Sequence, residues 1–304
     1  MTCRQLERAI QIQGIVLMCL LGGGLLGLTW PAPANATPAE SLLARHAGLE
    51  NRLRQNQFNR PVVLDSAETP NHVTGEIHAV IDYPFPAVSA GLNNPDHWCD
   101  VMHLHINTKY CRAVATPAGT VLKVNIGKKT AEKLSDAPRL EFKYLAAAVA
   151  PDYIDFRLSA KDGPMGTSDY RIELEAIPLE DGKTFLHLTY SYAMNFTARL
   201  AMHTYPATLG SGKVGFTQSG LTGVGQPQYI GGVRALVERN TMRDYLAIDS
   251  FLEAAPAAPA LRLDRRLQTW FSAVEMYPRQ LHEVERDDYI AMKRDEYRRQ
   301  QTAD

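Results

Sequence analysis

Residues 75–113 constrain the fold more than any other segment of this chain. An alternating strand pattern stops at Pro84, whose ring lacks the N–H that a strand ladder needs. Two short helices are predicted next, the second beginning at Pro95, and another alternating segment begins at His103. The order strand, helix, helix, strand indicates a mixed α+β domain rather than an all-helical bundle.

The N-terminal residues 1–36 have the pattern of a secretory signal. Arg4 and Arg8 precede an apolar run over 14–30, and Ala34-Asn35-Ala36 supplies small residues for cleavage. A retained membrane anchor is the alternative, but the run is short for a spanning helix and rich in glycine. We therefore expect export, to the bacterial periplasm, with no stable membrane insertion after cleavage.

The expected export determines how the four cysteines are interpreted. Cys3 and Cys19 fall within the predicted signal, which leaves Cys99 and Cys111 as the pair in the rest of the chain. Two such residues in an oxidising compartment usually form a disulfide. A metal site or a redox pair is less favoured because the two-residue spacing typical of those sites is missing.

Charge excludes one class of partner. The chain has a formal net charge of −1, and no concentrated basic region that could bind nucleic acid is evident. Composition and spacing divide the chain into a signal (1–36), a helical lead-in (37–72), a main domain (73–253), an Ala/Pro linker (254–260) and a charged helical tail (261–304).

The main domain is dominated by strand patterns. Turn signals such as Lys161-Asp-Gly-Pro164 separate short segments with period-two alternation, so consecutive strands should pair antiparallel. A long amphipathic helix is predicted over 232–253. The expected strands are 73–83, 103–114, 119–126, 140–149, 153–160, 169–177 and 185–196.

This element order, with the segments YPFPAVSAGL and GGVRALVERNTMRDYLAIDSFL, resembles the START-like superfamily, also called SRPBCC or polyketide-cyclase-like, in an exported bacterial branch. The resemblance implies an α+β helix-grip fold, in which a curved antiparallel sheet wraps around the long C-terminal helix and encloses an apolar cavity. Residues 197–228 and the tail after Ala254 depart from the usual pattern and can reshape the cavity mouth.

The candidate chemistry lies in the segment that begins at His103. On a strand, His103, His105, Asn107, Lys109 and Cys111 would share one face. A disulfide from Cys111 would draw this polar row toward the cavity. His103 and His105 would then be candidate acid or base groups, and Lys109 would polarise a carbonyl or hold a carboxylate.

Other interpretations of these residues remain open. The row can be the solvated face of an amphipathic strand. Metal binding by His103 and His105, with His97 or Asp100 as a third ligand, is a weak signal, and we expect neither a metal nor a cofactor. Tyr190 and Tyr192 share a strand face and are candidate ligand contacts, although buried tyrosines are more often core residues.

The sequence thus predicts an exported binding protein for a small, mostly apolar, lipid-like molecule in an enclosed cavity. One alternative is a cyclase or hydrolase on the same scaffold that uses the His103/His105/Lys109 row. A second alternative is a non-catalytic interaction module, with an envelope protein contacting the tail, 261–304. That tail carries apolar residues at helical spacing and is expected to fold back on the domain.

Overall fold

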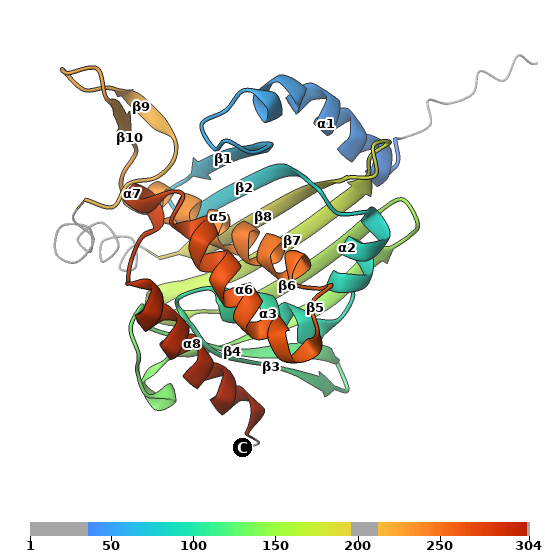
Figure 1. The fold of residues 1–304 in the computed structure, drawn as a ribbon, viewed down its shortest axis with the longest axis vertical. Helices are drawn as coiled ribbons and strands as arrows, with labels where there is room; N and C mark the ends of the chain where they lie inside the picture. The colour runs from blue at the N-terminus through green and yellow to red at the C-terminus, as the bar shows by residue number, and fades with distance from the viewer. Residues whose placement is uncertain (1–35, 196–211, 303–304) are drawn as a thin grey trace, which may run out of the picture. The chain divides into compact units, whose positions relative to one another are not determined.

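An eight-stranded antiparallel sheet organises the computed structural model, which describes residues 36–195 and 212–302 (Figure 1). Residues 1–35 of the predicted signal, including Cys3 and Cys19, lie outside the described residues. The strand order is β1-β2-β8-β7-β6-β5-β4-β3, so β3 to β8 form the predicted meander. The strands are β1 (Val62–Glu68), β2 (His72–Ile81), β3 (Thr108–Thr116), β4 (Gly119–Ile126), β5 (Arg139–Val149), β6 (Ile154–Asp162), β7 (Thr167–Pro178) and β8 (Thr184–Met194).

The long helix α5 (Gly232–Glu253) packs across one face of this sheet. Gly75 of β2 permits a close approach, because a Cβ atom at this position would overlap the Thr241 hydroxyl and lie 3.4 Å from the Val237 carbonyl. Leu246 and most of its neighbours on α5 are fully buried. The fold is therefore the predicted START-like helix-grip arrangement, with the sheet on one side of a long C-terminal helix.

A second, smaller core covers the opposite face of the sheet. Helix α1 (Pro38–Arg54) begins at a capping box between Thr37 and Glu40 and packs on β1, β2 and β7. Strand β1 was not predicted, because its apolar start, Val62-Val63-Leu64, does not alternate with polar residues. The buried members of this core are Leu42, Leu53, Val63, Tyr153, Ile177 and Phe185.

The segment after Pro84 departs from the prediction at one point. Helix α2 (Phe85–Leu92) and helix α3 (Pro95–Leu104) form as expected, with Asn94 capping α3. Helix α3 continues through His103, however, and β3 begins only at Thr108. The predicted strand start at His103 was wrong because Trp98, Val101 and Leu104 bury one side of a continuing helix.

The predicted disulfide joins this helix to the next strand. Cys99 of α3 and Cys111 of β3 are bonded, with their Cα atoms 5.1 Å apart. Both residues are buried in the main core. The cross-link therefore fixes the middle of α3 against the edge strand β3.

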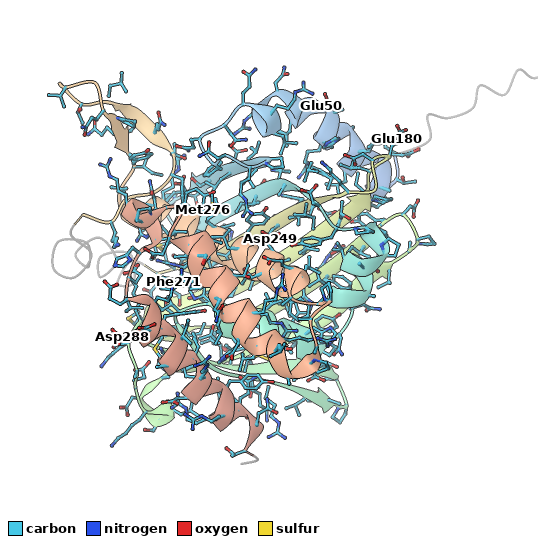
Figure 2. All side chains as sticks on the ribbon, viewed as in Figure 1. Glu50, Glu180, Asp249, Phe271, Met276 and Asp288 are labelled. Carbon is cyan, nitrogen blue, oxygen red and sulfur yellow. A yellow bond between two sulfur atoms is a disulfide. The ribbon has the colours of Figure 1, made fainter. Side chains whose placement is uncertain are left out.

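The tail folds back on the domain, as predicted. Helices α6 (Pro259–Val274), α7 (Pro278–Leu281) and α8 (Arg286–Gln301) follow the linker, and Phe271 of α6 lies among the core side chains (Figure 2). A hairpin of β9 (Gln218–Leu221) and β10 (Pro227–Tyr229) projects from the body (Figure 1). Short 3-10 turns occur at Leu134–Asp136 and Pro164–Gly166. No helix in the described ranges is long and apolar enough to cross a membrane.

Candidate functional site between the sheet and helix α5

The structure separates the polar row predicted to begin at His103. His103 lies in the last turn of α3, is 1% exposed, and its Nε2 lies 3.0 Å from the Lys293 carbonyl of α8. Asn107 donates to the Gly127 carbonyl at 2.7 Å. Lys109 points toward α8 instead. These residues therefore do not line one face together.

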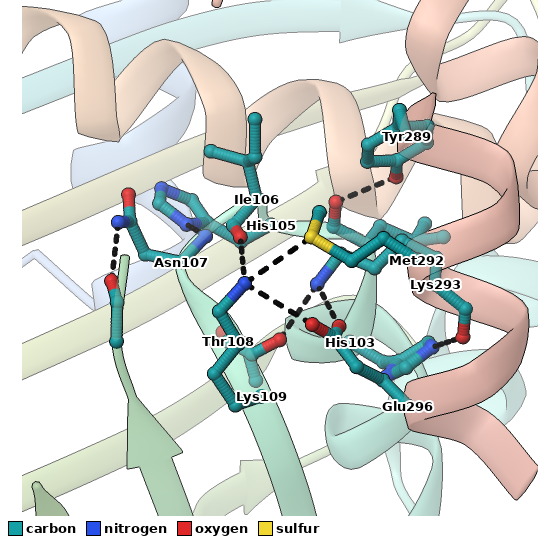
Figure 3. Close-up of polar contacts among 12 residues, drawn as sticks. His103, His105, Ile106, Asn107, Thr108, Lys109, Tyr289, Met292, Lys293 and Glu296 are labelled. Atoms are coloured by element: carbon teal, nitrogen blue, oxygen red, sulfur yellow. Dashed lines mark hydrogen bonds and ion pairs between the residues drawn. The ribbon is translucent and has the colours of Figure 1, made fainter. Parts of the chain in front are cut away.

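Lys109 belongs to a buried ionic cluster that attaches the tail (Figure 3). Its Nζ lies 3.1 Å from Oε1 of Glu296, and the Nζ of Lys293 lies 2.8 Å from Oε2 of the same carboxylate. Lys293 also donates to the Thr108 carbonyl at 2.6 Å. Burial lowers the pKa of Lys293 to about 8. Since both ammonium groups are fully enclosed, the cluster holds α8 against β3 and gives a substrate no direct approach.

His105 has a different environment from His103. It caps the C-terminal end of α3, and the residue is partly exposed. Burial lowers its pKa well below the usual value, and the nearby Arg243 guanidinium adds to this effect. The imidazole is therefore neutral at physiological pH, and it accepts a hydrogen bond from the Asn107 backbone N–H through Nδ1.

Tyr190 of β8 faces α5 from the sheet. It lies directly opposite Gly75 in the β2–β8 register, and the Asn240 side chain lies beside its phenol. Tyr190 keeps partial exposure, whereas Tyr192 is buried among the aromatic rings around Tyr170. Burial raises the pKa of Tyr190 well above its usual value. The structure therefore gives the two predicted tyrosines different roles.

Asp244 is the most perturbed carboxyl group near Tyr190. It lies one helical turn after Asn240 on α5, and it keeps partial exposure. Burial raises its pKa from 3.8 to about 7, against the opposing effect of Arg243. The Asp244 side chain therefore changes protonation near neutral pH.

Arg243 is bound by an ionic cluster of its own. Its Nη2 lies 2.7 Å from Oε1 of Glu283, and Nζ of Lys129 lies at the same distance from that oxygen. Arg243 Nη1 also donates to the Asn240 side chain at 3.4 Å. Because Glu283 pairs with this fully buried guanidinium, Arg243 does not neutralise Asp244 by a direct ion pair.

These four partly exposed groups carry little charge at neutral pH. An imidazole, a phenol, an amide and a carboxylic acid can exchange hydrogen bonds with a bound molecule without requiring a buried counter-ion. Asn240 and Asp244 were missed by the sequence analysis. Their signal was two polar residues spaced by one turn on a helix whose residues are mostly buried.

A separate depression of about 680 Å³ opens at one end of the sheet. It lies where β6, β7 and β8 approach their ends, and its lining is mostly small and polar. A large apolar molecule would find few contacts there. The lining residues are Asn71, Asp162, Gly163, Gly166, Thr167, Ser168, Ala193, Met194 and Asn195.

Comparison with known proteins gives distant structural likeness only. No family model matches the chain, and no curated protein matches it. Norcoclaurine synthase from Thalictrum flavum is 10% identical, with a TM-score of 0.33 over 47% of this chain and 84% of that one. Ara h 8.0201 is 11% identical, with a TM-score of 0.35 over 60% of this chain and 99% of that one.

A third solved structure has the same kind of likeness. The Zhui aromatase/cyclase from Streptomyces sp. R1128 is 12% identical, with a TM-score of 0.31 over 67% of this chain and 96% of that one. Values this low do not bear on function. The fold is START-like. That assignment rests on the strand order and the long helix described above.

Proposed function

We propose that this chain is an exported binding protein for a small, mostly apolar molecule held between the sheet and α5. The observation that supports this proposal is that Tyr190, Asn240, Asp244 and His105 are only partly buried, although most residues of α5 and β8 around them are buried. Burial nevertheless governs the pKa values of His105, Tyr190 and Asp244. Groups that are partly exposed and yet poorly hydrated are typical of the walls of a hollow inside a protein, so we infer a hollow at this place.

The lining sets the chemistry of the ligand. Aromatic residues from β7 and β8 supply apolar contacts, while Tyr190, Asn240 and Asp244 supply hydrogen-bonding groups from one side. A molecule with an apolar body and one or two polar groups fits this distribution. The disulfide between Cys99 and Cys111 supports an oxidising location such as the periplasm.

A titration with a dansyl-labelled medium-chain fatty acid tests the proposal. The wild-type chain should bind the probe saturably at one site. Asn240→Phe fills the hollow and should weaken binding about tenfold or more. Glu253→Phe lies on the same helix, where Glu253 pairs with the exposed Arg265, and should bind like wild type. Equal binding by wild type and Asn240→Phe would contradict this location.

Catalysis at the same site is a second candidate function. A carboxyl group with a pKa of about 7 is suited to proton transfer near neutral pH, and Asp244 has this property beside Tyr190. If the chain is a cyclase or hydrolase, its candidate catalytic residues are therefore Asp244 and His105 rather than the His103/His105/Lys109 row. Asp244→Asn should then abolish turnover of a bound substrate while leaving its binding within about threefold of wild type.

The interaction module is less well supported. Trp270, Phe271 and Leu281 of the tail are buried in the main core, so they are not available to a protein partner. An envelope partner would instead have to contact the charged outer side of α8, where Arg294 and Arg298 are exposed. Charge reversal at both arginines should abolish capture of such a partner without changing probe binding.

A further inference from the structure

A cluster of imidazole and carboxylate groups lies on the other face of the sheet, beneath α1. His78 of β2 and His187 of β8 occupy opposite positions in the strand register, and Glu76 lies two residues before His78 on the same face. One ligand atom from each of these three residues lies within 4.8 Å of the others. None of them contacts the hollow proposed above, because they face the opposite side of the sheet.

We propose that Glu76, His78 and His187 bind a divalent transition metal ion, with Zn²⁺ as the preferred ion. Two imidazoles and one carboxylate are a ligand set that zinc accepts, and they leave a fourth position open. Zinc bonds of about 2.0 Å place neighbouring ligand atoms roughly 3.3 Å apart. Nε2 of His187 and Oε2 of Glu76 are already 3.4 Å apart.

Glu175 and Tyr153 orient His187 for this role. Nδ1 of His187 lies 3.2 Å from Oε2 of Glu175, and the Tyr153 hydroxyl donates to the other oxygen of that carboxylate at 2.5 Å. A carboxylate that accepts from one imidazole nitrogen leaves the other nitrogen free to bind a metal. His187 therefore directs Nε2 toward Glu76.

His78 requires a small movement. Its ring stacks on His187, with centroids 4.3 Å apart and planes 6° from parallel, so both rings cannot direct a lone pair at one ion. The buried Nδ1 of His78 has no hydrogen-bond partner among the described residues, so no bond to that nitrogen opposes a rotation of the ring. Rotation of the imidazole about the Cβ–Cγ bond of His78 would bring one of its nitrogens toward the ligand atoms of His187 and Glu76.

The positively charged guanidinium of Arg45, on α1, occupies the place that the metal ion would take at this site. Its Nη1 lies 3.5 Å from Nε2 of His78 and 3.4 Å from Nε2 of His187. Arg45 also lies 3.1 Å from Nδ1 of His187, but we assign that nitrogen to Glu175, because a carboxylate is the stronger acceptor for its proton. Arg45 is an exposed residue on a long side chain and can leave when a metal ion enters.

Competition with a chromogenic zinc chelator tests the site in the full chain. All proteins carry Cys3→Ser and Cys19→Ser, so that free thiols outside the site bind no zinc. The parent protein should bind one equivalent of Zn²⁺. His78→Ala and His187→Ala should each weaken it about 100-fold, and Glu76→Gln should weaken it about tenfold or more. Arg45→Ala should bind at least as tightly as the parent.

The matched control is His72→Ala, which removes a histidine from the start of the same strand, outside the cluster. It should bind zinc like the parent. Cobalt substitution of the parent should give the absorption bands of a four-coordinate ion, a readout that needs no variant. An inability of the parent to compete for zinc would overturn the proposal and leave the cluster as an ion-pair network. Unchanged binding by His187→Ala in folded protein would also overturn it.

Discussion

Gly75 of β2 lies directly opposite Tyr190 of β8, and the missing Cβ atom of Gly75 is what allows Thr241 of α5 to pack against the sheet. The same close approach brings the Asn240 side chain beside the phenol of Tyr190. The sheet–helix contact and the candidate site therefore depend on one small residue. A side chain at position 75 would push α5 away from the sheet and would separate Asn240 from Tyr190.

Gly75→Ala should lower the free energy of unfolding by about 1–3 kcal/mol, because the added methyl group overlaps Thr241. Chemical denaturation measures the effect. Gly48→Ala is the matched control, since Gly48 lies within α1, where an added methyl group would contact no other described element. That control should stabilise the protein by up to about 1 kcal/mol. Equal stability of Gly75→Ala and wild type would show that α5 does not pack as described.

Asp244 should make stability depend on pH. Its folded-state pKa of about 7 lies above the ordinary value of 3.8, so the folded protein holds the proton between these values. The free energy of unfolding of wild type, relative to Asp244→Asn, should therefore fall as pH rises from 4 to 7 and stay constant above 7. After allowance for partial exposure, the fall should be on the order of 2 kcal/mol.

Denaturation at a series of pH values measures that difference. Asp264→Asn serves as the control, because Asp264 is exposed and paired with Arg294. It should show little change with pH relative to wild type. A relative stability of Asp244→Asn that is flat from acid to neutral pH would mean that Asp244 is ordinarily hydrated.

Glu296 should be essential for the attachment of α8. Glu296→Gln leaves the buried ammonium groups of Lys109 and Lys293 without their shared carboxylate, which should cost about 3–5 kcal/mol. Asp295→Asn, at the preceding residue, breaks only an exposed pair with Arg298 and should cost less than about 1 kcal/mol. Similar losses in the two variants would contradict the buried position of Glu296.

The disulfide should stabilise the protein measurably. Cys99→Ala combined with Cys111→Ala should lower the free energy of unfolding by about 3 kcal/mol, because the cross-link restricts the unfolded chain. Alkylation followed by intact-mass analysis should find neither residue free in the exported protein. A wild-type protein whose stability is unchanged by a reducing agent would contradict this contribution.

Much of the sheet could be predicted because its strands alternate and its turns are short. Asp169 to Glu175 shows this directly, since Ile172 and Leu174 are buried while Arg171 is exposed. Strand β1 could not be predicted in this way, because it presents consecutive apolar residues. His103 was misplaced because alternation and helical periodicity overlap in a short segment, and the burial of Trp98 and Leu104 decides between them.

The candidate site was harder to predict because its residues meet only in the folded chain. His105 and Tyr190 were singled out, but nothing in the local sequence relates Asp244 to Tyr190, which lie on different elements. The same holds for His78 and His187, whose pairing depends on the register of β2 against β8. Lys109 was judged by its own strand, whereas its partner Glu296 comes from the tail.

Native mass spectrometry of the exported protein, followed by organic extraction, tests the binding proposal most directly. We expect a defined apolar compound at near-stoichiometric level on wild type, and its loss from Asn240→Phe. The same folded mass without any compound in both proteins, together with no binding of the labelled fatty acid by wild type, would contradict a ligand site between the sheet and α5.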